Sequence, residues 1–333
     1  MIHKERYHII VSNNSKALAP KRLLNEMTSI EDLRLDPLIG MEVGTSTILR
    51  ELARGGSAVV FIAFQRTLKR QIAIKILPKS LLTPETAERF QIEAEAAAIL
   101  SHPNIIPVYE VGETDDFLFI AMQLIQGNSL AYHIKAAKKN VLPSRRYLPV
   151  ETTVTIMAQV LDGLDYAHHQ DIIHRDIKPG NILVESGSKR PIILDFGIAR
   201  VSRGLDKENY AIRGTPIYMP PEQVRNETAD GRADIYASGI MLFEMLVSDL
   251  PLPKIDPVEL LSLKMRRKDR LFMVKPSELN PVVNPDMDGI VLRAIAFDPG
   301  NRFDSCAEFR QALLDYRNRH LRKTGQKRPY AGD

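Results

Sequence analysis

The hydrophobic pattern divides the chain into a strand-rich part followed by a helix-rich part. Short apolar runs separated by turn residues predict β-strands in the first part. These runs are Ile48–Leu52, Val59–Phe64, Gln71–Leu77 and Phe117–Leu124. One helix is predicted among them, because Thr83-Pro84 offers an N-cap with proline at the first helical position and alanine-rich Ala87–Leu100 continues the pattern. His102-Pro103 ends this helix.

After Gly127 the apolar positions recur mostly at helical spacing, and only Ile182–Val184 and Ile192–Leu194 have strand character. The predicted helices are Thr152–His168, Ile235–Leu246, Pro257–Arg267, Met287–Ala296 and Cys306–Leu321. The pattern therefore predicts an α+β fold with a small strand-rich lobe followed by a larger, mainly helical lobe. A cleft between two such lobes is a natural ligand site.

Composition is that of a globular protein, with 44% hydrophobic and 26% charged residues among 333. The single cysteine, Cys306, allows neither an intramolecular disulfide nor a cysteine-built zinc site, and it is expected to be buried in the final helix. No run approaches the ~18 consecutive apolar residues of a membrane helix, and the first 20 residues lack the apolar core of a signal peptide. These features favour a cytoplasmic protein without a membrane partner.

The net charge is concentrated at the C-terminal end. The whole chain carries +4, from 45 basic and 41 acidic residues. Residues 317–333 contain six basic residues and one acidic residue, a local charge of +5, so the rest of the chain is nearly neutral. A neutral body does not indicate a nucleic-acid partner. The basic tail is interpreted as a solvated end, with docking to an acidic partner as the alternative.

The residues that carry chemistry occur in three ordered motifs. His174-Arg175-Asp176-Ile177-Lys178-Pro179-Gly180-Asn181 is the most specific, and Asp195-Phe196-Gly197 follows it, with the two aspartates 19 positions apart. Upstream lies Ile72-Ala73-Ile74-Lys75. Over about residues 47–316 the chain resembles the protein kinase family, in its eukaryotic-like (Hanks-type) serine/threonine branch of bacteria.

The resemblance implies a bilobal kinase fold and an ATP-dependent serine/threonine kinase that acts in bacterial signalling. Its domains would be an N-terminal extension at 1–46, a small lobe at 47–125, a large lobe at 126–316 and a basic tail at 317–333. ATP and Mg²⁺ would be the cofactors. The partners would be proteins with Ser or Thr hydroxyls, this chain included, and a homodimer through the small lobe rests on family analogy alone.

The resemblance also assigns roles around the phosphates of ATP. Asp176 would be the catalytic base, and Lys178 would steady the transferring phosphate. Asn181 and Asp195 would be the Mg²⁺ ligands. Lys75 would reach the α- and β-phosphates on the same strand face as Ala73.

A carboxylate must hold Lys75, and two glutamates of the following helix are candidates. Glu93 lies nine residues before His102 and is chosen for that spacing, whereas Glu95 is expected to be solvated.

Matching positions also define an ATP pocket, in which the adenine would contact apolar side chains and the hinge backbone. The glycine-rich loop departs from the family pattern, because Ala53 and Ala58 stand where the first and third glycines are usual. Alanine at the first position restricts the backbone, so ATP binding is expected to survive with a weaker affinity or a stiffer loop. The predicted pocket residues are Leu52, Ala53, Arg54, Gly55, Gly56, Ser57, Ala58, Val60, Ala73, Lys75, the gatekeeper Met122, the hinge residues Gln123, Leu124 and Ile125, and Leu183.

Several further positions match scaffold roles. Glu222 is expected to form a buried ion pair with Arg302, and Asp234 to hydrogen-bond the catalytic-loop backbone. Thr215 would contact Asp176 and, with the segment to Glu222, position a peptide. The basic clusters Lys264–Lys268 and Lys138–Arg146 are interpreted as solvated faces, and His168, His169 and His174 as structural residues rather than metal ligands.

The activation segment that the resemblance implies, Asp195–Glu222, lacks a usual phosphorylation site, because Arg203–Gly214 contains no Ser or Thr. Asp206 or Glu208 could supply charge toward Arg175, and a solvated loop is an equally good interpretation. Two alternatives to an active protein kinase remain. One is a pseudokinase, a scaffold or binding module with the same fold. The other is a kinase-like enzyme for a small molecule, which would need no peptide platform around Thr215–Glu222.

Overall fold

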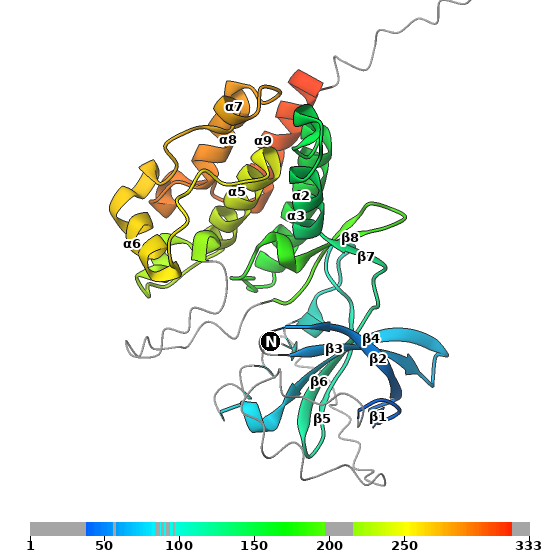
Figure 1. The fold of residues 1–333 in the computed structure, drawn as a ribbon. Helices are drawn as coiled ribbons and strands as arrows, with labels where there is room; N and C mark the ends of the chain where they lie inside the picture. The colour runs from blue at the N-terminus through cyan, green and yellow to red at the C-terminus, as the bar shows by residue number, and fades with distance from the viewer. Residues whose placement is uncertain are drawn as a thin grey trace, which may run out of the picture. The chain divides into compact units, whose positions relative to one another are not determined.

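The computed structural model describes residues 38–55, 58–83, 87, 90, 94–95, 97–196 and 216–321. These residues form two compact units (Figure 1). The first comprises the chain to Ser101 together with Ile106–Ile125, and the second comprises His102–Ile105 together with the chain from Gln126. None of the helices in the described ranges is long and apolar enough to cross a membrane.

The first unit is built on one antiparallel sheet of six strands in the order β1-β2-β3-β4-β6-β5. The strands are β1 (Glu42–Val43), β2 (Ser46–Arg54), β3 (Val59–Gln65), β4 (Arg70–Pro78), β5 (Val108–Glu113) and β6 (Phe117–Met122), with a 3₁₀ turn, η2, at Lys79–Leu81. Four of these strands are those that the apolar runs predict. β5 has no fully buried residue, which explains why its hydrophobic signal is weak.

The two faces of β4 pack against different apolar clusters. Ile72, Ile74 and Ile76 lie in the core cluster on one face. Alternation places Ala73, Lys75 and Leu77 on the other face. Leu77 there belongs to a second cluster that contains Phe90 and Ala94 of the chain between β4 and β5.

The second unit contains a small antiparallel sheet, β7 (Gly127–Ser129), β8 (Ile182–Glu185) and β9 (Pro191–Ile193), and a group of helices. The helices are α2 (Leu130–Lys138), α3 (Val150–His168), α4 (Pro221–Val224), α5 (Arg232–Val247), α6 (Pro257–Arg267), α7 (Pro276–Leu279), α8 (Pro285–Ala294) and α9 (Cys306–Tyr316). Short 3₁₀ turns are η3 (Pro143–Arg145), η4 (Pro179–Asn181), η6 (Pro216–Tyr218), η7 (Lys268–Arg270) and η8 (Pro299–Asn301). A π-helical turn, η9 (Arg317–Leu321), continues α9.

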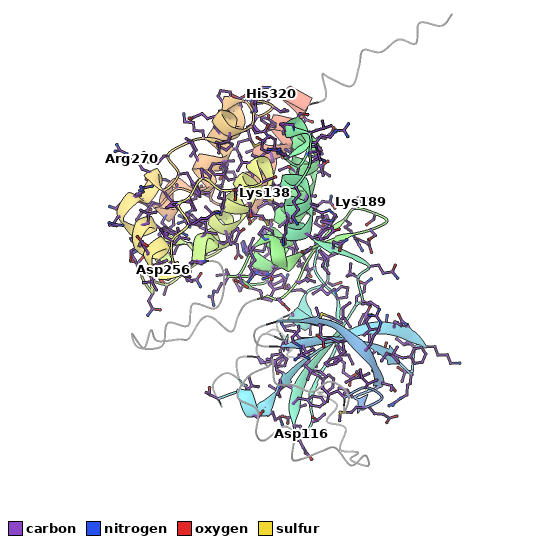
Figure 2. The ribbon with its side chains drawn as sticks, in the orientation of Figure 1. Asp116, Lys138, Lys189, Asp256, Arg270 and His320 are labelled. Atoms are coloured by element: carbon purple, nitrogen blue, oxygen red, sulfur yellow. The ribbon has the colours of Figure 1, made fainter. Side chains whose placement is uncertain are left out.

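Helix α5 is the buried centre of this unit, and nearly all of its residues are inaccessible to solvent. Gly239 allows α8 to approach it, because a Cβ at this position would lie 2.7 Å from the Cβ of Ala294. Helix α6 begins where the sequence predicts. Asp256 (Figure 2) accepts hydrogen bonds from Val258 N and Glu259 N, and Pro257 occupies the first helical position.

Candidate active site

The catalytic loop in the second unit is anchored by one buried carboxylate. Asp234 of α5 is fully buried and accepts hydrogen bonds from His174 N and Arg175 N, each at 2.8 Å. His168 Nε2 of α3 lies 2.8 Å from the same carboxylate. Burial by itself would raise the pKa of Asp234, but the hydrogen bonds and the nearby histidines hold its pKa below the ordinary value. The predicted role of Asp234 is confirmed.

The His174 ring connects the catalytic loop, which Asp234 anchors, with Asp176 and with the segment of Leu194 and Phe196. Its Nε2 lies 2.8 Å from Leu194 O, a carbonyl that must accept, so Nε2 carries the proton. Its Nδ1 accepts from Asp176 N at 3.2 Å. Both ring nitrogens are therefore used by a neutral imidazole, and the buried ring also packs against Phe196 with centroids 4.7 Å apart.

Two other predicted site residues, Lys178 and Asn181, donate hydrogen bonds to the Asp176 carboxylate. Lys178 Nζ donates to Asp176 Oδ2 at 2.6 Å, and Asn181 Nδ2 donates to the same oxygen at 3.0 Å. Asn181 Nδ2 also donates to the Asp176 main-chain oxygen at 2.8 Å. Since the amide nitrogen of Asn181 is directed at Asp176, its Oδ1 is left to face another group.

Asp195 lies two residues after the end of β9 in the second unit. It has a backbone conformation that non-glycine residues rarely adopt. Its φ is +49°, and that of Arg175 is +63°. Such positions persist only where surrounding contacts impose them. Leu194 N donates to Asn181 O at 2.8 Å, which ties the segment of Asp195 to η4. Asp195 itself is exposed, whereas Phe196 beside it is buried.

The first unit holds the other predicted site residues on adjacent strands. Lys75 of β4 is paired with Val60 on one side and Ile120 on the other, and Ala73 is paired with Met122. The hinge begins at Gln123, whose N donates to Pro107 O at 3.0 Å. Ile125 is almost fully buried. Leu183, the remaining residue of the predicted adenine pocket, lies on β8 in the second unit.

The glycine-rich loop closes through a main-chain hydrogen bond from Gly55 N to Ala58 O, 2.9 Å long. Leu52 and Ala53 are exposed at the end of β2, and Arg54 forms an ion pair with Glu51 at 3.1 Å. Ala58 is buried in the cluster of Leu77 and Phe90.

Several predicted residues lie outside the described part of the chain. They are Gly56, Ser57, Glu93, Gly197, Asp206, Glu208 and Thr215. Glu95, the other candidate partner of Lys75, is described and is exposed.

The predicted ion pair of the large lobe is present and buried. Arg302 Nη1 lies 2.7 Å from Glu222 Oε1, and Nη2 lies 2.8 Å from Oε2. The remaining N–H groups of the guanidinium donate to the main-chain oxygens of Ala296, Arg232 and Phe297, so all five donors are used. This interaction holds α4, which follows η6, against the segment after η8.

The prediction that the basic cluster Lys264–Lys268 is a solvated face is wrong at Lys264. Lys264 is 1% exposed, and its Nζ donates to the main-chain oxygens of Pro216, Ile217 and Met219. Its neighbours Arg266 and Arg267 are exposed, as the pattern predicts. The sequence alone does not indicate that this side chain binds carbonyl groups of η6, because a lysine in the last turn of a helix is typically solvated.

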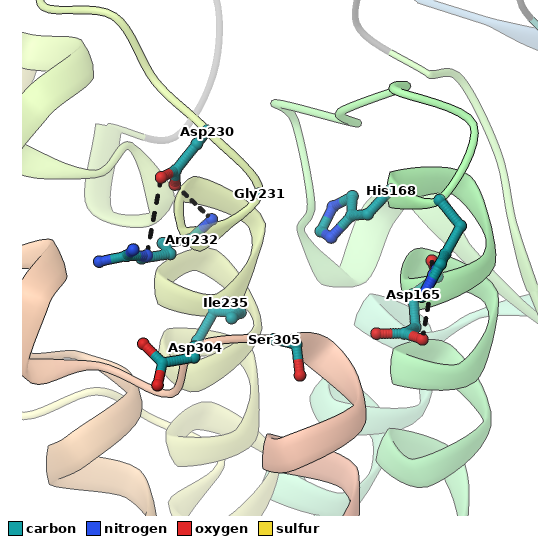
Figure 3. A pocket seen from close by; sticks show the side chains of 9 residues that line it. Asp165, His168, Asp230, Gly231, Arg232, Ile235, Asp304 and Ser305 are labelled. Atoms are coloured by element: carbon teal, nitrogen blue, oxygen red, sulfur yellow. Dashed lines mark hydrogen bonds and ion pairs between the residues drawn. The ribbon is translucent and has the colours of Figure 1, made fainter.

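A surface pocket of about 310 Å³ lies between the C-terminal end of α3, the start of α5 and the segment before α9 (Figure 3). Its lining residues are Asp165, His168, His169, Asp230, Gly231, Arg232, Ile235, Asp304 and Ser305. His168 forms part of the wall and is one hydrogen bond from Asp234.

Cys306 is buried beside the pocket wall. Burial raises the pKa of its thiol well above the ordinary value. Its Sγ lies 3.8 Å from His168 Nδ1. The three histidine rings have different partners: the His168 ring contacts Asp234, the His169 ring contacts Asp165 O and the His174 ring contacts Leu194 O.

Comparison with known proteins gives consistent similarities. The family model described as "Protein kinase domain" matches residues 46–320. Serine/threonine-protein kinase Pkn1 of Myxococcus xanthus is 32% identical over 298 residues, which cover 88% of this chain and 41% of Pkn1. Tyrosine-protein kinase MasK of the same species is 30% identical over 310 residues, which cover 89% of this chain and 46% of MasK. The chain thus spans less than half the length of these two relatives.

Among solved structures, the kinase domain of PknI from Mycobacterium tuberculosis is similar to this chain with a TM-score of 0.65 and 29% sequence identity. The similarity covers 83% of this chain and 98% of that domain. It extends over both the strand-rich and the helical part, so the α+β bilobal fold class that the sequence predicts is confirmed.

Proposed function

The chain belongs to the protein kinase family, and from this membership we propose that it transfers the γ-phosphate of ATP to serine and threonine hydroxyls of proteins, itself included. Its relatives Pkn1 and PknI come from bacteria, which supports a role in bacterial signalling. The observation that carries the proposal is the hydrogen-bonded cluster of Asp176, Lys178 and Asn181.

Asp176 is suited to orient an attacking hydroxyl. Its carboxylate sits in a loop whose main chain is fixed by Asp234, and a carboxylate held in this way accepts the hydroxyl proton with little reorganisation. Lys178 places a cation against the same carboxylate. A phosphoryl group passing beside Asp176 would therefore meet a positive charge that offsets its own.

The donor set also fits a magnesium ion. Asn181 directs its amide nitrogen at Asp176 and keeps Oδ1 as a ligand, and Asp195 adds an exposed carboxylate. Hard oxygen donors of this kind suit Mg²⁺. Bound there, the ion would neutralise phosphate charge.

We assign ATP binding to the residues on the strands of the first unit and to Leu183. Lys75 would hold the α- and β-phosphates with Glu93 as its carboxylate partner, and Gly55 would present main-chain N–H groups to phosphate. Ala73, Val60 and Met122 would contact the adenine. The backbone of Gln123–Ile125 would hydrogen-bond to it.

The test is phosphate transfer from labelled ATP with Mg²⁺, to the chain itself and to dephosphorylated casein. Asp176→Asn should lower the rate by about a hundredfold or more, as expected for loss of a general base. Asp171→Asn is the matched control, because Asp171 is exposed in the same loop at a positive φ that asparagine also tolerates. The control should keep the wild-type rate.

The acceptor is tested with peptides identical except for Ser, Thr or Tyr at one position. Transfer to Ser and Thr supports the proposal, and transfer to Tyr alone would replace it with the specificity named for MasK. ATP binding without transfer, unchanged by Asp176→Asn, would instead identify a pseudokinase.

A further inference from the structure

The side-chain amino group of Lys264 forms its hydrogen bonds with main-chain carbonyl oxygens. Its Nζ lies 3.2 Å from Pro216 O and 2.6 Å from Ile217 O, and it also donates to Met219 O. Three acceptors match the three N–H donors of a lysine ammonium. In the described ranges no carboxylate forms an ion pair with it, and its Nζ lies 5.0 Å from the centre of the Tyr236 ring.

Burying a charged lysine is costly, and three hydrogen bonds to carbonyl oxygens offset part of that cost here. Without a cation, the three carbonyl oxygens would converge on one point with their negative ends facing each other. Residues 216–219 would then have to turn their oxygens toward water. The lysine of α6 therefore fixes the main-chain conformation of η6 and of Met219.

The segment it holds begins one residue after Thr215 and ends at α4. Its other end is also fixed, because Glu222 of α4 is paired with Arg302. In its middle, the Tyr218 hydroxyl donates to the Glu244 carboxylate of α5. Lys264 is thus one of three side-chain attachments of a short stretch that contains prolines at 216, 220 and 221.

We propose that Lys264 is a positioning residue for the phosphoacceptor peptide, which sets the conformation of residues 216–220 on which the peptide binds. The inference rests on the proposed kinase function, because the peptide-binding role of this segment follows from it. The expected consequence is a selective one. Loss of Lys264 should weaken the peptide complex while the ATP site, which is built from other residues, is unchanged.

The experiment measures KM for casein and KM for ATP in the full chain. Lys264→Met removes all three donors and should raise the KM for casein about tenfold, the effect of losing a hydrogen bond from a charged donor. Lys264→Gln keeps a two-donor amide without the charge and should give an intermediate value. Arg266→Met removes the same charge from an exposed position of the same helix and should match the wild type.

The outcomes separate this inference from the kinase assignment. If wild-type protein transfers no phosphate, the proposed function fails. If wild-type protein is active but Lys264→Met lowers kcat and leaves the KM for casein unchanged, Lys264 is merely structural and the inference is wrong. Should the methionine variant not fold, the glutamine variant decides, and an unaltered KM for casein there would also overturn it.

Discussion

At the scale of single residues, two buried ionisable side chains, Asp234 and Lys264, have opposite electrostatic environments. Asp234 receives hydrogen bonds from His168, His174 and the catalytic-loop backbone, and these contacts keep its pKa low despite complete burial. Lys264 has only neutral carbonyl partners. Burial lowers its pKa to about 7, with Glu222 raising it and Arg302 lowering it. A buried carboxylate with donors stays charged, whereas a buried ammonium without a counter-ion becomes easy to deprotonate.

The lowered pKa of Lys264 predicts a specific pH dependence of stability. In the unfolded chain its pKa returns to 10.5, so between pH 7 and this value the unfolded state binds more protons than the native state. The free energy of unfolding contributed by Lys264 therefore rises with pH in that window, by up to about 1.4 kcal/mol per pH unit. Below pH 7 both states are protonated and the contribution is constant.

Urea unfolding of wild type and of Lys264→Met from pH 6 to pH 9 tests this prediction, because subtraction removes the other titrating groups. Glu222, Arg302 and Tyr236, which face the lysine, are the same in both proteins. The wild type should gain stability relative to the variant only above about pH 7. A difference that is the same at every pH would show that the pKa of Lys264 is not lowered.

At the scale of elements, the glycine-rich loop shows how two alanines in one motif can differ. Ala53 is exposed at the end of β2, and its φ is not positive, so its Cβ imposes no strain. Ala58 is 6% exposed and packs in the cluster of Leu77 and Phe90. Ala53 therefore carries no left-handed backbone strain, and Ala58 contributes to the core.

Glycine substitutions should separate the two positions. Ala53→Gly should change the KM for ATP by less than about twofold, as for other exposed substitutions. Ala58→Gly should lower the free energy of unfolding by about 1–2 kcal/mol, because it adds backbone entropy to the unfolded chain and removes a buried methyl group. Steady-state kinetics and urea unfolding measure these effects. A tighter ATP complex in Ala53→Gly would restore the expectation that alanine stiffens the loop.

Helices and motifs with strong local signals could be predicted from the sequence. Contacts with residues far away in the sequence could not. Helix α6 begins at Pro257 as predicted because its cap, Asp256, is adjacent in sequence. The residues of the catalytic loop could be identified because their chemistry requires fixed types at fixed spacing. The carbonyl partners of Lys264 lie 45 to 48 residues away in sequence. No local pattern indicates such a partner, so the sequence predicts a solvated lysine at this position.

At the scale of the whole molecule, the Glu222–Arg302 pair joins positions 80 residues apart and closes the helical unit around α5. The unit contains exposed ion pairs of similar length, such as Arg293–Glu308 at 2.8 Å, with both side chains at least 40% exposed. The Arg302 and Glu222 side chains are 0% and 5% exposed, and Arg302 donates two hydrogen bonds to the carboxylate and three to main-chain oxygens. The two pairs therefore compare a buried, fully hydrogen-bonded ion pair with an exposed one.

Glu222→Ala should destabilise the protein by about 3–5 kcal/mol, because it leaves a buried guanidinium without its carboxylate. In a double-mutant cycle with Arg302→Met, the coupling energy should reach about 2–3 kcal/mol, since the second substitution removes the charge that the first one strands. The cycle for Arg293 and Glu308 should give less than about 1 kcal/mol. Equal coupling energies at the two sites would mean that the buried pair stabilises the unit no more than a surface contact does.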